Sequence, residues 1–134
     1  MNKYSKYIKF FKFSVFAKKK EKLFYYNFFE KFNFKPVRIY FIKNIHSKNV
    51  RGKHAHKKTR QIFFCISGSV TINFYNKHGL LKSIKLNEKK NLSLITLRPV
   101  WLELCNFSKS CNLLVLADKK FSKKDYINDR NKIT

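Results

Sequence analysis

The chain has 134 residues, 44% of them hydrophobic and 15 of them phenylalanine, which is enough for one domain with a buried core. This composition excludes an intrinsically disordered chain. The formal net charge is +24, from 31 Lys and Arg against 7 Asp and Glu. The chain has no P-loop, no G-x-G-x-x-G and no G-x-S-x-G motif, so these nucleotide-binding and hydrolase signatures are excluded.

The basic charge is carried mainly by lysine, because arginine occurs at only five positions. Lys, Phe, Asn, Ile and Tyr share A- and T-rich codons, so a biased genome accounts for much of this composition. Lysine also lacks the planar fork with which arginine recognises bases and phosphates. We therefore keep a basic nucleic-acid-binding β-barrel only as the least favoured alternative. A basic surface would also attract a phosphorylated substrate.

The three cysteines are an odd number and include no C-x-x-C pair, so they predict neither a disulfide framework nor a zinc knuckle. They fit a reducing cytoplasm. Near the N-terminus, residues 10–17 are apolar but interrupted by Lys12 and followed by Lys18–Lys20. This run is too short to cross a membrane, and we interpret it as the first strand rather than as a targeting segment.

The next elements, in chain order, are short and rich in β-branched and aromatic residues, as is typical of strands. Regular spacing and polar turns favour an all-β sandwich or barrel in a single domain over residues 1–134. Near the end, Ser122 followed by Asp125 resembles a capping box and predicts a short C-terminal helix over residues 123–128. The predicted strands are residues 37–43, 61–67, 70–75, 81–86, 92–97, 101–107 and 111–117.

The candidate for chemistry is the run Arg51-Gly-Lys-His54-Ala-His56. Residues i and i+2 of a strand point to the same face, so His54 and His56 would present two imidazoles together. Imidazole titrates near neutral pH and can accept and return a proton in one cycle. The alternative is a pair of structural histidines with satisfied hydrogen bonds. The neighbouring Arg51-Gly52 favours the functional interpretation.

An H-x-H pair also suggests a metal, but the remaining ligands are missing. Gln61 stands where a carboxylate ligand would be expected, and residues 99–106 contain no third histidine. Two histidines alone make a weak site. We predict no metal and no other cofactor.

At these residues the sequence resembles the WxcM-like cupin family of sugar 3,4-ketoisomerases, which act on dTDP-4-keto-6-deoxyglucose. The resemblance is clearest over residues 34–133. Its carriers are Arg38-Ile-Tyr40, Arg51-Gly-Lys-His-Ala-His-Lys57, Gln61, Cys65-Ile-Ser-Gly-Ser69, Pro99, Trp101-Leu-Glu103, Asn106-Phe-Ser, Leu113–Ala117 and Asp125-Tyr-Ile-Asn-Asp129.

The resemblance implies a cupin-type jelly roll, a homodimer, and a metal-independent isomerase that moves the sugar carbonyl from C4 to C3. It implies a dTDP-linked keto-deoxy sugar as substrate, in the biosynthesis of deoxy and amino sugars for surface polysaccharide such as lipopolysaccharide. His54 and His56 would be catalytic. A non-catalytic nucleotide-sugar-binding cupin is the alternative. The implied substrate-binding residues are Arg38, Tyr40, Arg51, Lys57, Gln61, Trp101 and Glu103.

Overall fold

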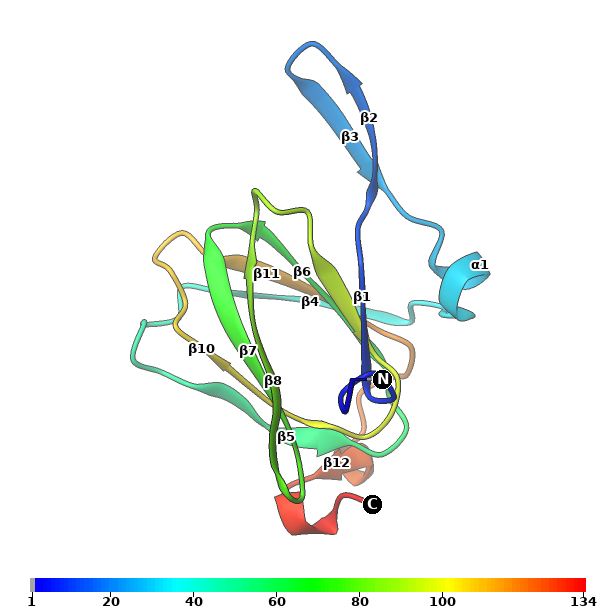
Figure 1. Cartoon of the computed structure of the whole chain (residues 1–134), viewed down its shortest axis with the longest axis vertical. Coiled ribbons are helices and arrows are strands. Elements are labelled where there is room, and N and C mark those ends of the chain that lie inside the picture. The colour runs from blue at the N-terminus through cyan, green and yellow to red at the C-terminus, as the bar shows by residue number, and fades with distance from the viewer. Residues whose placement is uncertain (1) are drawn as a thin grey trace.

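The computed structural model describes residues 2–134 as two packed antiparallel sheets and a projecting hairpin (Figure 1). The first sheet has the order β1-β9-β6-β11-β4 and the second the order β12-β5-β10-β7-β8. The strands are β1 (Ile8–Phe11), β2 (Ser14–Lys18), β3 (Glu21–Tyr25), β4 (Arg38–Lys43), β5 (Arg51–His56), β6 (Gln61–Ser67), β7 (Ser69–Asn76), β8 (Gly79–Asn87), β9 (Ser93–Thr96), β10 (Trp101–Cys105), β11 (Asn112–Ala117) and β12 (Tyr126–Ile127).

The predicted all-β sandwich is confirmed, and its core follows from the period-2 alternation of the strands. In β7, Val70, Ile72 and Phe74 are fully buried, while the residues between them are partly exposed. They pack against Phe63 of β6 and Val115 of β11 from the other sheet. The seven predicted strands all occur, with ends that differ by at most two residues.

The prediction that residues 10–17 form the first strand is wrong in the bounds of that strand. The apolar run at residues 10–17 does not form one strand, because the chain leaves the first sheet after Phe11. β1 pairs with β9, whereas β2 pairs only with β3, in a hairpin that projects from the sandwich (Figure 1). The sequence also gave no signal for the one α-helix among the described residues, α1 (Phe28–Phe32).

The C-terminal helix is a second correction. Lys123–Asp125 forms a single 3-10 turn, and the side chain of Ser122 makes no capping hydrogen bond. The chain then extends as β12, which pairs Tyr126 with His56 and Ile127 with Ala55 of β5. Because the carboxylate of Asp125 is bound to groups beside β5, it does not cap a helix. A second 3-10 turn covers Arg130–Lys132.

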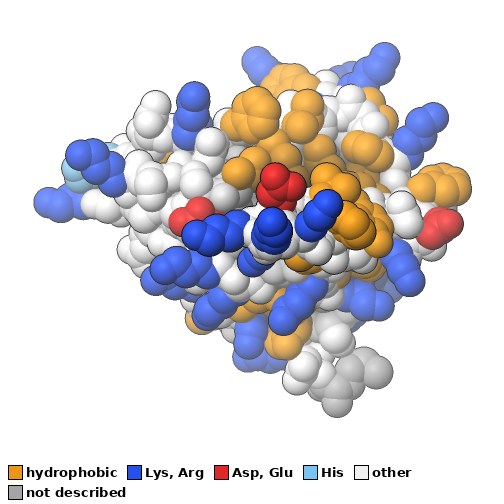
Figure 2. All heavy atoms as spheres, turned by 90° about the horizontal axis from the view of Figure 1, so that it is seen from above, with side chains coloured by type: hydrophobic (Ala, Val, Ile, Leu, Met, Phe, Trp, Pro, Cys, Tyr) orange, Lys and Arg blue, Asp and Glu red, His pale blue; other side chains and the backbone are white. Residues whose placement is uncertain are grey.

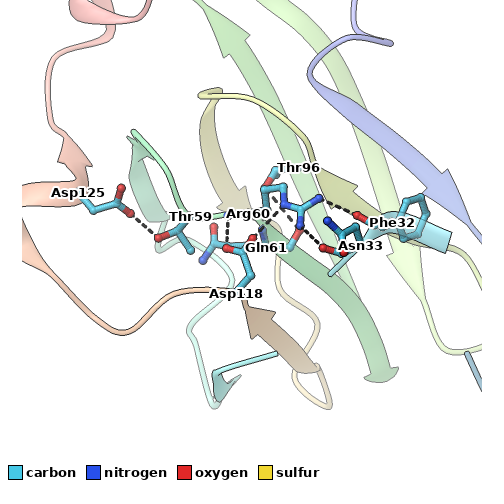
Figure 3. A network of polar contacts seen from close by, with 8 residues as sticks. All are labelled: Phe32, Asn33, Thr59, Arg60, Gln61, Thr96, Asp118 and Asp125. Carbon is cyan, nitrogen blue, oxygen red and sulfur yellow. Dashed lines mark hydrogen bonds and ion pairs between the residues drawn. The ribbon is translucent and has the colours of Figure 1, made fainter. Parts of the chain in front are cut away.

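Arg60 joins the segment around α1 to the sandwich (Figure 3). Its Nε donates to Asp118 at 2.9 Å, and its terminal nitrogens donate to the carbonyl oxygens of Phe32 and Asn33. The backbone N–H of Arg60 donates to the other oxygen of Asp118. One guanidinium thus satisfies carbonyl groups at the end of a short helix, which could not be stable alone.

Apolar side chains gather on the face seen from above in Figure 2, with lysines and arginines around them. All residues of β2 and β3 are exposed, and Phe16 and Leu23 are more than 60% exposed although they lie opposite each other in the hairpin. β4 is an edge strand whose Ile39 and Phe41 are also exposed. In residues 2–134 there is no helix long and apolar enough to cross a membrane.

Candidate functional site

A cavity of about 390 Å³ opens between the two sheets at β4, β5, β10 and β12. This volume lies within the range of small-molecule sites. Its polar lining comes from residues far apart in the sequence, which the sheet pairing brings together. The residues at its wall include Arg38, Tyr40, Arg51, His54, Gln61, Leu102, Leu104 and Tyr126.

A β-bulge in β5 decides which side chains enter this cavity. Leu102 and Leu104 of β10 lie opposite His54 and Arg51, so one extra residue of β5 is accommodated between the two pairs. Gly52 and Lys53 both have positive φ at this point, +86° and +60°. In a regular strand Arg51 and His54 would face opposite sides. The bulge therefore places the guanidinium on the same wall as the imidazole.

The imidazole of His54 is held in one tautomer. Its Nδ1 lies 2.9 Å from the carbonyl oxygen of Gly52, and because a carbonyl only accepts, Nδ1 carries the hydrogen. The ring stacks on Tyr126 with centroids 4.5 Å apart and planes 7° apart. Burial lowers the pKa of His54, partly opposed by the Gly52 hydrogen bond. His54 is therefore neutral near pH 7, with Nε2 available as a proton acceptor.

His56 lies deeper, with its ring centroid 5.0 Å from that of His54, so the predicted pairing of the two rings on one face is confirmed. Its Nδ1 donates to Asp125 at 2.9 Å, and its Nε2 is buried without a partner. Burial lowers the pKa of His56 more than the hydrogen bond with Asp125 raises it. His56 is thus a second neutral imidazole with a free nitrogen.

Asp125 supports this arrangement as a carboxylate. Burial raises its pKa, but the hydrogen bonds from Thr59, from the backbone N–H of Lys58 and from His56 together outweigh burial and lower it. Its backbone oxygen also accepts from the N–H of Lys57 at 2.7 Å. These contacts fix the 3-10 turn beside β5 and set the tautomer of His56.

Tyr40 and Arg38 form the wall contributed by β4. The Tyr40 hydroxyl accepts from Gln61 at 2.7 Å, and burial raises the pKa of Tyr40 to about 12, so the phenol keeps its proton. Arg38 places its guanidinium 5.7 Å from the ring centroids of both Tyr40 and Phe121, and its Nε is buried without a partner. A ligand with oxygen acceptors would satisfy that donor.

The structure brings together six of the nine site residues predicted from the sequence and separates the other three. Arg38, Tyr40, Arg51, His54 and Gln61 line the cavity, and His56 lies behind His54. Trp101 and Glu103 alternate with the inward-facing Leu102 and Leu104, so they lie on the outer face of the sheet. There the indole N–H of Trp101 donates to Glu103 at 3.0 Å. Lys57 is exposed and lines other pockets.

Two further residues, Asp125 and Tyr126, contact the histidines, and the sequence analysis did not propose either of them for the site. The one indication of them in the sequence was the Asp125-Tyr-Ile run, which lies near the end of the region that resembles the family. Among the described residues, no three His, Cys, Asp or Glu side chains converge as a metal-binding group would.

Comparison of folds places this sandwich in a known class. Over 89% of this chain and 76% of the other, it superposes on a dTDP-4-dehydrorhamnose 3,5-epimerase from Bacillus anthracis with a TM-score of 0.75 at 13% identity. The expected cupin-type architecture is thereby confirmed.

A narrower assignment comes from the sequence. The family described as "FdtA: WxcM-like, C-terminal" matches residues 6–134, and the chain belongs to this family.

Relatives of known structure cover nearly all of the chain. It is 32% identical to the 3,4-ketoisomerase QdtA from Thermoanaerobacterium thermosaccharolyticum, solved with TDP, over 91% of this chain and 88% of the other, with a TM-score of 0.82. A histidine-to-asparagine variant of QdtA was solved with TDP-4-keto-6-deoxyglucose. A 3,4-ketoisomerase from Helicobacter canadensis is 31% identical over 91% and 90% of the two chains, with a TM-score of 0.83.

The chain is also similar to a TDP-4-oxo-6-deoxy-α-D-glucose-3,4-oxoisomerase from Aneurinibacillus thermoaerophilus. The two are 32% identical over 94 residues, which are 70% of this chain and 66% of that relative. The matched region thus spans just under two thirds of the relative's own length.

The bulge can be tested with Gly52→Ala. A Cβ at this position would lie 2.9 Å from the carbonyl oxygen of Leu102, and the positive φ disfavours a side chain. We expect the free energy of unfolding, measured in urea, to fall by about 1–3 kcal/mol. Lys53→Gly is the matched variant, and it should be neutral or stabilising because glycine tolerates its φ of +60°. Equal loss in both variants would contradict this account.

Lowered histidine pKa values predict how stability depends on pH. Unfolded histidine titrates near pH 6.5, so a folded-state pKa below that value favours the folded state above pH 6.5. This contribution is lost as the pH falls from about 6.5 towards the folded pKa values. We therefore expect a smaller free energy of unfolding at pH 5.5 than at pH 7.5. The difference should shrink in a His54→Gln/His56→Gln variant and persist in His78→Gln, whose side chain is exposed.

Proposed function

We propose that this protein is a nucleotide-sugar 3,4-ketoisomerase that converts a dTDP-4-keto-6-deoxyhexose to its 3-keto isomer. The observation that carries the proposal is the free Nε2 of neutral His54 at the wall of a cavity that also holds Arg38 and Arg51. The ketoisomerases that cover most of the chain at about 30% identity support the same assignment. The two guanidinium groups suit a diphosphate.

His54 acts as the general base in the proposed reaction. Its Nε2 removes the proton from C3, the electron pair of that bond forms the C3–C4 double bond, and the C4 oxygen takes a proton to give an enediol. The O3 hydroxyl then loses its proton and becomes the carbonyl, while His54 returns a proton to C4. The reaction is internally balanced and needs no cofactor or metal. The neutral Tyr40 phenol is placed to donate to a sugar oxygen.

His56, behind His54, assists in this scheme by exchanging protons with the hydroxyl oxygens, and the hydrogen bond from its Nδ1 to Asp125 leaves Nε2 as the nitrogen that can accept a proton. Gln61 holds the Tyr40 hydroxyl, and Arg51 contacts the substrate. We place the protein in the cytoplasm, in the biosynthesis of deoxy or amino sugars for surface polysaccharide.

Turnover of dTDP-4-keto-6-deoxyglucose in D₂O, followed by NMR of the product, tests the proposal. Wild type should form the 3-keto isomer, with solvent deuterium at C4, and EDTA should leave the rate unchanged. His54→Asn should lower kcat by about 10²- to 10⁴-fold because the base is lost. His78→Asn should keep the wild-type rate, since His78 lies in the exposed β7–β8 turn. Binding without conversion by wild type would instead favour the non-catalytic nucleotide-sugar-binding cupin.

We also propose that the protein is a homodimer. An isolated two-stranded hairpin is marginally stable in water, yet β2 and β3 expose apolar residues on both of their faces. A second copy of the same chain would cover these side chains together with the exposed residues of β4. The expected symmetry is two-fold, the commonest among soluble oligomers.

Light scattering coupled to size-exclusion chromatography tests the dimer. Wild type should elute with twice the chain mass, and Phe16→Asp/Leu23→Asp should elute as a monomer because two charges would be buried in the contact. Leu80→Asp is the control, since Leu80 is exposed on β8 next to the β7–β8 turn, which lies at the end of the molecule opposite the hairpin (Figure 1). A monomeric wild type would overturn the proposal.

A further inference from the structure

A second concave site lies beside the 3-10 turn, outside the cavity of the histidines. It has a volume of about 260 Å³, and its wall is built from two separate segments of the chain that meet there. One segment follows β5 and the other follows β11. The lining residues are Lys57, Lys58, Thr59, Lys119, Lys120, Ser122, Lys124 and Asp125.

Five of these eight residues are lysines, and all five are exposed at the rim. Like charges within a few ångströms of each other repel, and a concave surface concentrates their field. A high lysine content alone would spread such charges over the surface, but here both segments contribute them to one hollow. The arrangement therefore produces a strongly positive potential at one place.

No carboxylate of residues 2–134 forms an ion pair with any of these lysines. In residues 2–134 the ion pairs are His56–Asp125 and Arg60–Asp118, and neither includes a lysine. Asp125, the only acid at the wall, already accepts from Lys58 N–H, His56 and Thr59. Asp118, next to Lys119, has both oxygens bound to Arg60. An anion from solution is the group that could neutralise the pocket.

The size of the pocket and the donors at its wall define the class of anion. Its volume is below that of the histidine cavity and of most small-molecule sites, so it suits a compact ligand better than a nucleotide-sugar. Ser122, whose side chain makes no capping bond, adds a hydroxyl. Several flexible ammonium groups around a small hollow match a ligand with several phosphate oxygens.

We propose that Lys57, Lys58, Lys119, Lys120 and Lys124 form a binding site for a compact polyphosphate anion, distinct from the sugar-nucleotide cavity. The anion is either an inorganic polyphosphate or the phosphate tail of a free nucleotide, which share this chemistry. Binding here does not depend on the proposed isomerase activity, because neither His54 nor Arg51 lines the pocket.

Calorimetric titration of the full chain with inorganic triphosphate tests the site. Wild type should bind one triphosphate per chain, more weakly as salt is added. Lys119→Ser/Lys120→Ser should weaken binding by about fivefold or more, since two of the five charges are lost. Lys89→Ser/Lys90→Ser is the matched control, because it removes the same charge from an adjacent, exposed pair after β8. The control should change the affinity less than twofold.

Equal weakening in the two double variants would overturn the proposal, because binding would then follow net charge alone. The absence of triphosphate binding by wild type, or binding only of a single-stranded DNA oligonucleotide, would overturn it as well. A parallel titration with TDP separates the sources. If TDP affinity also falls in Lys119→Ser/Lys120→Ser but not in the control, the pocket takes a nucleotide's phosphate tail. If TDP affinity is unchanged, the pocket takes the inorganic anion.

Discussion

The arrangement of the histidines depends on one carboxylate, that of Asp125. It accepts from His56, from Thr59 and from the backbone N–H of Lys58, so a single side chain joins the C-terminal segment to β5. Because its lone pairs are used by donors, burial does not neutralise it. Tyr126 follows directly and stacks on His54, so the same contact positions the second imidazole too.

Much of the fold could be predicted from the sequence because the strands are short, regularly alternating and separated by polar turns. The strands of the sandwich were visible as β-branched and aromatic runs such as residues 61–67. The C-terminal helix was predicted wrongly for a physical reason. Ser122 and Asp125 have the spacing of a capping box, but the carboxylate has stronger partners across the turn, in residues 56–59. Local spacing does not reveal such a tertiary competitor.

The site was predicted in part for a similar reason. Two histidines at i and i+2 must share a face of a strand, and they do. Arg51, at i−3 from His54, shares that face only because of the bulge, whose single sequence signal is Gly52. Trp101 and Glu103 lie on the outer face, as alternation with the buried Leu102 and Leu104 requires. The β2–β3 hairpin and α1 were not predicted, because the phenylalanines in these segments follow neither the helical nor the strand periodicity.

The shortage of acidic residues also determines how the folded chain responds to its solvent. In most proteins, added salt weakens the attractive ion pairs on the surface. The two ion pairs among residues 2–134 are partly or largely buried, so salt weakens them less. Salt therefore screens mainly repulsion between the 31 lysines and arginines. The same ions that compete for the lysine pocket will thus strengthen the fold and any apolar contact between copies. The folded chain is therefore least stable in dilute buffer and gains stability as salt is added.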